Sequence, residues 1–324
     1  MVDFLILIII VALLFDISNG WNDSANAIAT VVSTKVLSPL AAVSMAAAMN
    51  IAGAFLTTAV AKTIGTGIVD PSFINDNLVM AALLSAFAWN TVMTLIGLPV
   101  SASHALVGGL VGAAVAHGGT AILNYNGITK ILMALLISPF FGILIGFAFM
   151  KLIASVFANS VPGRVNKYFG RLQILSSAMM AFGHGSNDAQ KVMGIITMAL
   201  LSRGIITTLE VPTWVILSAA LAMGVGTFFG GWKVIKTIGV KMLKLQPVHG
   251  FAAETSATFI IVGASALGLP VSTTHVISTA IIGVGATTRL SAVRWGVAGK
   301  IVLAWVLTLP VCIGFAWGIM KLIG

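Results

Sequence analysis

Two short polar motifs occur twice in this chain, in the same order, and each interrupts an otherwise apolar stretch. Residues 20–27 read GWNDSANA, and a degenerate copy, GSNDAQK, begins 165 positions later at residues 185–191. A second motif, GLPVSASH at residues 97–104, returns as GLPVSTTH at residues 268–275. Polar sequences are costly inside lipid and usually mark a substrate path. Because they are duplicated at matching places, the sequence predicts two related halves of a secondary transporter.

The apolar runs exclude a soluble protein. Hydrophobic residues make up 59% and charged residues 8% of the 324 residues, whereas a soluble domain is about 25% charged. The runs are too long and too uniformly apolar for the strands of a barrel, so the sequence predicts an all-α polytopic membrane protein. The expected segments are 2–33, 40–62, 78–117, 128–151, 172–201, 213–235, 250–287 and 295–323.

The polar motifs divide these segments further. We expect broken helices near 18–23 and 183–188, where Gly and Asn stand, and helical hairpins that turn near 97–99 and 268–270. A stretch with Asn159, Pro162, Gly163 and several basic residues predicts the connection between the halves. The expected division is residues 1–151 for the first repeat, 152–171 for a cytoplasmic linker and 172–324 for the second repeat.

Charge placement predicts the orientation. If the N-terminus is outside and each hairpin returns to the side from which it entered, the inner side holds eleven basic residues and no acidic one. These are Lys35, Lys151, Arg164, Lys167, Arg171, Lys233, Lys236, Lys241, Lys244, Arg289 and Arg294. The outer side holds Lys62, Lys130, Arg203 and Lys321 with Asp3, Asp70, Asp76 and Glu210. This distribution obeys the positive-inside rule, so we expect a multi-pass protein of the cytoplasmic membrane with both termini outside.

The same count predicts that the two halves have opposite topologies. The acidic loop 63–77 falls outside, and its counterpart, the lysine-rich loop 233–246, falls inside. Two copies of one unit inserted in opposite directions form an inverted-topology repeat, which is common in transporters. The net charge of +9 lies in these short loops, so nucleic acid is not an expected partner.

The Asn-Asp motifs are candidate cation sites. Amide and carboxylate oxygens suit a hard cation such as Na⁺, and a buried carboxylate needs a charged partner or an ion. The expected sodium ligands are Asn22, Asp23, Asn26, Asn187, Asp188 and Gln190. The alternative is that each Asp is only the N-cap of a helix that starts after it.

The Pro-Ser-His turns are candidate anion sites. Pro99 and Pro270 suit the first turn of a helix, which leaves hydroxyl groups and free backbone N–H groups at a helix N-terminus, where phosphate binds readily. The expected phosphate ligands here are Ser101, Ser103, Ser272, Thr273 and Thr274, with His104 and His275 as donors to the anion or carriers of a coupled proton. The alternative is an ordinary turn between packed helices.

Four further charged residues fall within or next to the apolar segments. Lys191 follows Asp188 by three residues and could balance either that carboxylate or a bound anion. Glu254 is a candidate coupling or gating carboxylate, with an interfacial position as the alternative. Asp16 and Lys300 receive no role from the sequence.

The chain resembles the inorganic phosphate transporter (PiT) family. Residues 20–27 and 184–191 are similar to the paired signatures of that family, and residues 98–104 and 269–275 are similar to its second motif. The resemblance implies phosphate import coupled to Na⁺ or H⁺, an inverted-repeat fold of about twelve helical elements, and a homodimer. It also implies phosphate contacts for Asn26 and Lys191. Lys191 stands where the first copy has Asn26, as in bacterial members of the family.

The resulting hypothesis is a secondary transporter that imports inorganic phosphate by symport, not an enzyme. Co-bound cations would offset the charge of phosphate in a low-dielectric site. Because the two oxygen-rich pairs Asn22-Asp23 and Asn187-Asp188 include no histidine, we expect Na⁺ rather than H⁺ as the coupling ion, and no cofactor besides it. The alternatives are a proton-coupled phosphate or sulfate permease and a passive anion channel.

Overall fold

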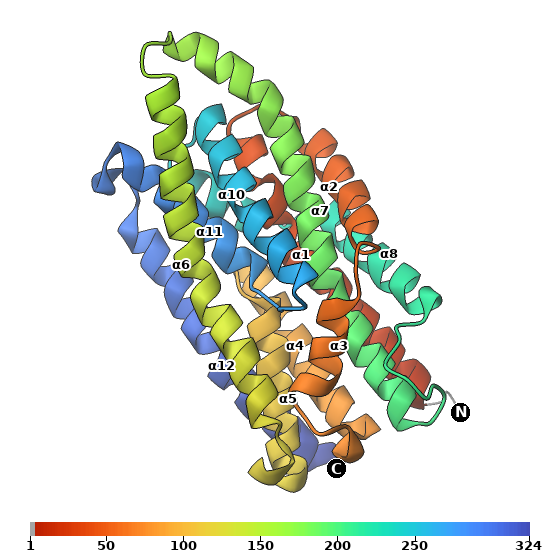
Figure 1. The fold of residues 1–324 in the computed structure, drawn as a ribbon. Coiled ribbons are helices and arrows are strands. Elements are labelled where there is room, and N and C mark those ends of the chain that lie inside the picture. Colours follow the sequence, from red (N-terminus) through yellow and green to blue (C-terminus); the bar gives the residue numbers. More distant parts are fainter. Residues whose placement is uncertain (1–3) are drawn as a thin grey trace.

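The computed structural model describes residues 4–324, which form twelve α-helices and four short helical turns with no β-strand in that range (Figure 1). Asp3, assigned to the outer side from the sequence, lies outside the described residues. The helices of the first half are α1 (Phe4–Ser33), α2 (Pro39–Gly53), α3 (Ala59–Gly67), α4 (Asp76–Ile96), α5 (Ala102–Gly118) and α6 (Tyr125–Val156). Those of the second half are α7 (Pro162–Ser202), α8 (Thr213–Phe229), α9 (Trp232–Lys236), α10 (Pro247–Ala266), α11 (Thr273–Thr288) and α12 (Trp295–Ile323).

Four helices, α1, α4, α6 and α12, are long and apolar enough to cross a membrane. Helix α8 makes a fifth span with the segment Trp232–Lys241, and the two parts are bent by 61° at a short break. Many large apolar side chains on α6 and α12 are exposed, among them Phe140, Leu144 and Val306. Exposed apolar side chains along long helices are expected where the solvent is lipid, so the prediction of a helical membrane protein is confirmed.

The breaks predicted near 18–23 and 183–188 are wrong. Helices α1 and α7 run without interruption through both Asn-Asp motifs. The glycines serve close packing instead: a Cβ at Gly20 would lie 2.4 Å from the carbonyl oxygen of Met223, and one at Gly185 would lie 2.1 Å from that of Asn50. Backbone can approach backbone this closely only where a side chain is missing. The helices that do break are the spans α2–α3 and α8–α9.

The segments 78–117 and 250–287 form helical hairpins, α4–α5 and α10–α11, as predicted. Gly97 and Gly268 end the first helix of each hairpin with positive φ angles of 84° and 66°, a conformation that favours glycine. The backbone N–H of Asp70, just before α4, donates to the carbonyl of Ile122, just after α5. Arg294 N–H likewise donates to Met242 O across the ends of the second hairpin. Each hairpin therefore returns to the side from which it starts.

The two halves exchange partners throughout the structure. The last helix of each half packs on the second hairpin helix of the other, α6 against α11 and α12 against α5. The first two helices cross over in the same way, α1 against α8 and α7 against α2. In Figure 1, α4 and α5 lie toward one end of the molecule and α10 and α11 toward the other. The core is thus built between the halves as well as within them.

Most of the predicted linker 152–171 is helical. Helices α6 and α7 extend into both sides of the expected linker 152–171, and only residues 157–161 are non-helical. This connection lies at the end of the molecule opposite to the N- and C-termini (Figure 1).

Candidate functional site

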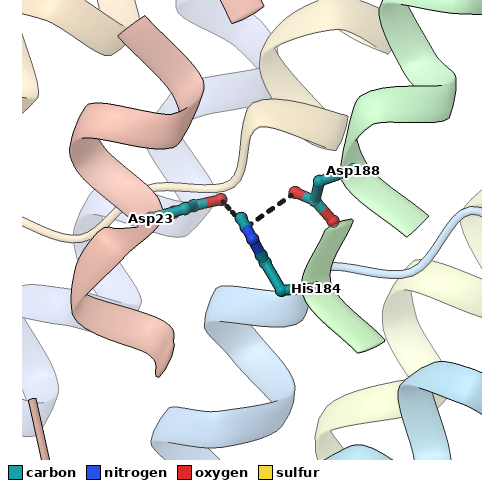
Figure 2. A group of neighbouring side chains, drawn as sticks. All are labelled: Asp23, His184 and Asp188. Atoms are coloured by element: carbon teal, nitrogen blue, oxygen red, sulfur yellow. Dashed lines mark ion pairs between the residues drawn. The ribbon is translucent and has the colours of Figure 1, made fainter. Parts of the chain in front are cut away.

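The two Asn-Asp motifs meet at the centre of the fold. Asp23 on α1 and Asp188 on α7 face each other across the imidazole of His184, also on α7 (Figure 2). His184 Nε2 lies 3.6 Å from Asp23 Oδ2 and 3.7 Å from Asp188 Oδ2. All three side chains are buried. They form a group whose ligand atoms all lie within 4.8 Å of one another, close enough to hold one metal ion.

The hydrogen-bond network determines which ring nitrogen of a neutral His184 carries the hydrogen. Thr227 Oγ1 donates its hydrogen to the carbonyl of Met223 (2.9 Å) and therefore accepts from Asn50 Nδ2 (2.8 Å). Asn50 Oδ1 then faces His184 Nδ1 at 3.0 Å, so Nδ1 carries the hydrogen of that bond. A neutral His184 thus presents the lone pair of Nε2 to the two carboxylates, and a protonated one presents an N–H.

Asp188 already has a cationic partner. Lys191 Nζ lies 2.7 Å from Asp188 Oδ2, and both side chains are buried. The spacing of three residues on a continuous helix places the two side chains on one face. Thr273 Oγ1 donates to the same carboxylate oxygen at 3.3 Å. Of the two partners that the sequence allowed for Lys191, the structure therefore shows Asp188.

Asp23 is held by the turn of the second hairpin. Thr274 Oγ1 donates to Asp23 Oδ1 at 2.8 Å. Asn26, one turn further along α1, donates through Nδ2 to the hydroxyls of Thr274 (3.0 Å) and Thr273 (3.3 Å). The first Asn-Asp motif and the second Pro-Ser-His turn therefore form one hydrogen-bonded unit, although about 250 residues separate them in the sequence.

The two hairpin turns lie directly against each other. Ser103 Oγ donates to the carbonyl of Val271 at 2.9 Å, and the hydroxyl of its counterpart Thr274, which donates to Asp23, lies 3.0 Å from the carbonyl oxygen of Val100. The first turns of α5 and α11 are thereby brought together. Each contributes the unpaired backbone N–H groups and the partial positive charge of a helix N-terminus.

Ser101 and Ser272 are the N-caps of α5 and α11. Their hydroxyls accept from the backbone N–H of His104 and His275, each at 3.2 Å. The two imidazole rings pack together with centroids 4.7 Å apart, and His275 also packs on Trp305 at 3.9 Å. The cap bond uses one lone pair of each hydroxyl, so the predicted anion-ligand role is compatible with this geometry at Ser272. Ser101 Oγ also lies 2.7 Å from His104 Nδ1, a contact in which either atom can donate.

Three predicted cation ligands also bond to the surrounding structure, although Asn187 Oδ1 has no hydrogen-bond partner. Asn22 Nδ2 donates to Thr94 Oγ1 at 2.8 Å, and Asn187 Nδ2 donates to Ser265 Oγ at 3.0 Å, so each asparagine braces the hairpin of its own half. Gln190 Oε1 accepts from two backbone N–H groups at the start of α3, at 2.8 and 3.1 Å. A side-chain oxygen that caps a helix in this way is not free for a cation.

Glu254 lies in a separate polar cage. Its carboxylate accepts from the hydroxyls of Thr30 and Ser176 and from Gln173 Nε2 at 3.3 Å, and it is buried. The interfacial alternative is therefore wrong, because the side chain reaches no surface. The equivalent positions of the other half are all apolar core residues, namely Leu83, Ile195, Val11 and Ile8. The cage thus belongs to one end of the molecule only.

The two unassigned residues differ in their surroundings. Asp16 is buried on α1, where it interacts electrostatically with Asp188 and Lys191. Lys300 is exposed near the start of α12, whereas the residues of the polar centre are buried.

Sequence reasoning missed His184. The residue precedes the second motif and stands four positions before Asp188, a spacing that places both side chains on one helical face. That signal was hidden by the expectation of a helix break between them. A third repeat was also missed: the string KTIG occurs at 62–65 and again at 236–239. Its threonines bind the hairpin turns of the opposite half, Thr63 to Gly268 O at 2.7 Å and Thr237 to Gly97 O at 2.8 Å.

The chain is similar to known proteins over nearly its whole length. The sequence model of the phosphate transporter family matches residues 19–163 and again 157–316. A Bacillus subtilis (strain 168) protein described as a probable low-affinity inorganic phosphate transporter is 49% identical over 94% of this chain and 93% of its own. A Rhizobium meliloti (strain 1021) protein with the same description is 47% identical over 94% and 91% of the two chains. A solved structure titled "The sodium-dependent phosphate transporter" matches with a TM-score of 0.92 and 28% identity, over 99% of this chain and 98% of that one.

A helical membrane fold with a buried, duplicated polar centre defines a membrane transport protein rather than an enzyme. The family match and the relatives specify the class further: the chain belongs to the phosphate transporter family. The family resemblance drawn from the four motifs is therefore confirmed, and so is the prediction of a phosphate transporter.

Proposed function

We propose that this protein imports inorganic phosphate by symport with cations, with Na⁺ as the coupling ion. The observation that carries the proposal is the contact between the two hairpin turns and the two aspartates. Thr274 donates to Asp23 and Thr273 donates to Asp188. A group of helix N-termini, which favours an anion, thus adjoins a carboxylate pair, which favours a cation.

The proposed phosphate site lies between the first turns of α5 and α11. Its ligands are the hydroxyls of Ser101, Ser103, Ser272, Thr273 and Thr274 and the free N–H groups beside them. Hydrogen bonds to a charged group contribute about 1.5–3 kcal/mol each, and the helix termini add fixed partial charge. His104 and His275 serve in this proposal as oriented packing partners of the turns.

The proposed cation site is built around Asp23, with Asn26 and His184 beside it, while Asp188 on the other side of His184 is paired with Lys191. Asn22, Asn187 and Gln190 hold the hairpins and α3 in place, so we reassign them from ligands to positioning residues. Glu254 is proposed as a gating carboxylate, because its cage joins α1, α7 and α10 at one end only.

Sodium coupling is supported by the relative whose title names sodium dependence. The sequence argument for Na⁺ does not hold, however, since it relied on the absence of histidine and His184 lies between the two aspartates. That same contact favours the second candidate, proton coupling, because an imidazole between two carboxylates is a ready proton carrier.

Alternating access is proposed to follow from an inverted repeat, with both termini outside and the 157–161 connection inside. The opposite placement of the two hairpins and the exchange of partners between the halves support this arrangement. A homodimer remains a prediction from the family resemblance.

Uptake of radioactive phosphate into proteoliposomes tests the function. We expect accumulation against a gradient when Na⁺ is higher outside, and little uptake under an inward pH gradient with K⁺ as the only other cation. Full uptake in the second condition supports the proton-coupled candidate instead. Equilibration without accumulation in either condition would indicate a passive channel, and competition by sulfate measures anion selectivity.

Asp23→Asn is the matched variant. The amide keeps the size of the side chain and can still accept from Thr274, but it lacks the charge that holds a cation. We expect coupled uptake to be lost while the protein remains folded in detergent. An Asp23→Asn protein that still accumulates phosphate would contradict the cation site.

A further inference from the structure

The two Asn-Asp motifs differ at one chemically important position. With the offset of 165 residues that aligns Asp23 with Asp188, Asn26 aligns with Lys191. A neutral amide in one half therefore corresponds to an ammonium group in the other. Each residue lies three positions after its aspartate on an uninterrupted helix, Asn26 on α1 and Lys191 on α7. Asn26 and Lys191 therefore differ in charge at equivalent positions of the two halves.

The ammonium of Lys191 occupies the position of a cation ligand to Asp188. It lies 2.7 Å from Asp188 Oδ2, and its side chain is only 1% exposed. Because both groups are buried away from water, the carboxylate of Asp188 and the ammonium of Lys191 neutralise each other. The pair needs no additional ion to be stable.

Asp23 has no such partner. Among the residues that the structure describes, its polar contacts are the hydroxyl of Thr274 and the imidazole of His184, and no Lys or Arg lies within ion-pair distance. Asn26 follows it on the same helix, and its Oδ1 is buried without a hydrogen-bond partner. Buried oxygens without a hydrogen-bond partner also lie in the other half, at Asn187 Oδ1 and Asp188 Oδ1, so the two halves differ in the ammonium group of Lys191 and not in their free oxygens.

We propose that the Lys191 ammonium is a built-in replacement for one coupling cation, so that the Asp188 half of the site binds none and the Asp23 half binds one. The proposal rests on cation-coupled phosphate symport as the function. It predicts that the chain transports one cation fewer per phosphate than the same site would with an amide at position 191.

Asp16 is buried near Asp188 and Lys191, so its charge also contributes to the field at this position. It is unchanged in every variant below and therefore cancels in the comparisons between them. Lys191 could alternatively release Asp188 and bind the phosphate itself, which is the competing interpretation that the experiment must separate.

The test measures the number of cations per phosphate. Proteoliposomes are held at zero membrane potential and fixed internal pH, and the final phosphate accumulation is measured at several gradients of whichever cation drives uptake. The slope of log phosphate ratio against log cation ratio is the number of coupled cations. We expect Lys191→Asn, which restores the amide of the first half, to raise this slope by one.

Two further variants keep the test decisive if Lys191→Asn folds poorly. Lys191→Arg retains the charge and should keep the wild-type slope. Asp188→Asn/Lys191→Asn removes both charges together, leaves no unpaired ion, and should also keep the wild-type slope. A slope one unit lower in this double variant would show that Asp188 binds a transported cation, and the proposal would then be wrong.

A second readout needs no transport. Ligand binding stabilises the folded state in proportion to the number of sites filled, so the melting temperature of Lys191→Asn in detergent should rise more steeply with log cation concentration than that of the wild type. An unchanged slope and melting response, with weaker phosphate binding, would identify Lys191 as a phosphate ligand and overturn the proposal. A wild type without any cation dependence would instead contradict the symport function, and the inference would fall with it.

Discussion

At the scale of single residues, the centre of this protein uses each side chain for more than one contact. Thr274 donates to Asp23, accepts from Asn26 and approaches the carbonyl of Val100. Such a group cannot be changed without disturbing both the turn and the carboxylate. Residue roles are therefore best separated by substitutions that remove one property and keep another.

Ser272 offers such a pair of substitutions. Its hydroxyl caps α11, and the loss of a serine cap to alanine costs about 0.5–2 kcal/mol, whereas glycine costs only a few tenths. We expect both Ser272→Ala and Ser272→Gly to weaken phosphate binding at least about tenfold, because each removes a hydroxyl that hydrogen-bonds to a charged ligand. Isothermal titration with phosphate in saturating Na⁺ measures the effect.

The thermal stability of the two variants provides the control. Only Ser272→Ala should lower the melting temperature appreciably. If Ser272→Gly binds phosphate as tightly as the wild type, the serine is a cap alone and the anion-ligand role is refuted.

At the scale of the helices, the order and approximate ends of the apolar segments could be predicted from the sequence, and so could both hairpin turns. Those features depend on local signals: apolar runs, Gly97 with Pro99, and Gly268 with Pro270. The continuity of α1 and α7 could not be predicted in the same way. Gly20 and Gly185 carry the same local signal as a break, and only the partner helices α8 and α2 decide that they serve packing.

The prediction of the site was likewise limited to features with a local signal in the sequence. The hairpin turns could be predicted as candidate anion sites because their chemistry is local to each motif. Asn22, Asn187 and Gln190 were predicted as cation ligands, and the sequence did not reveal that their amide groups also bond to Thr94, Ser265 and the start of α3. Those partners lie about 70 to 130 residues away in the chain, and composition alone does not indicate them.

Gly185→Ala tests the packing role of the motif glycines. The added Cβ would lie 2.1 Å from the backbone oxygen of Asn50, which cannot move without shifting α2. Overpacking of this kind costs about 1–3 kcal/mol, so we expect a lower melting temperature in detergent. Gly314→Ala is the matched control, since nothing lies within 4 Å of its Cβ position. Equal stability of the two variants would contradict the close packing.

At the scale of the whole molecule, the arrangement of the ends supports the orientation predicted from charge. The termini lie at one end and the 157–161 connection at the other (Figure 1). Together with the basic residues near that connection, this arrangement is consistent with the proposed placement of the connection on the inner side under the positive-inside rule.

Cysteine labelling tests the orientation. The native Cys312 is buried, so it should react slowly with a membrane-impermeant maleimide. In intact cells we expect Thr207→Cys, in the exposed loop between α7 and α8, to be labelled, and Asn159→Cys, in the connection between the halves, to be protected. Lysis should expose the second site. The reverse pattern would invert the proposed topology.

The exchange of helices between the halves also has a consequence for how the protein is made. When α6 leaves the ribosome, the helix on which it packs, α11, has not yet been synthesised. The hydrogen bonds that Ser24 accepts from the backbone N–H of Gly231 and that the carbonyl of Gly97 accepts from Thr237 likewise cannot form until the second half has been synthesised. Insertion of the first six helices therefore precedes their final packing, and a newly made first half stays in the bilayer as an open scaffold. The polar centre closes only when nearly the whole chain has entered the membrane.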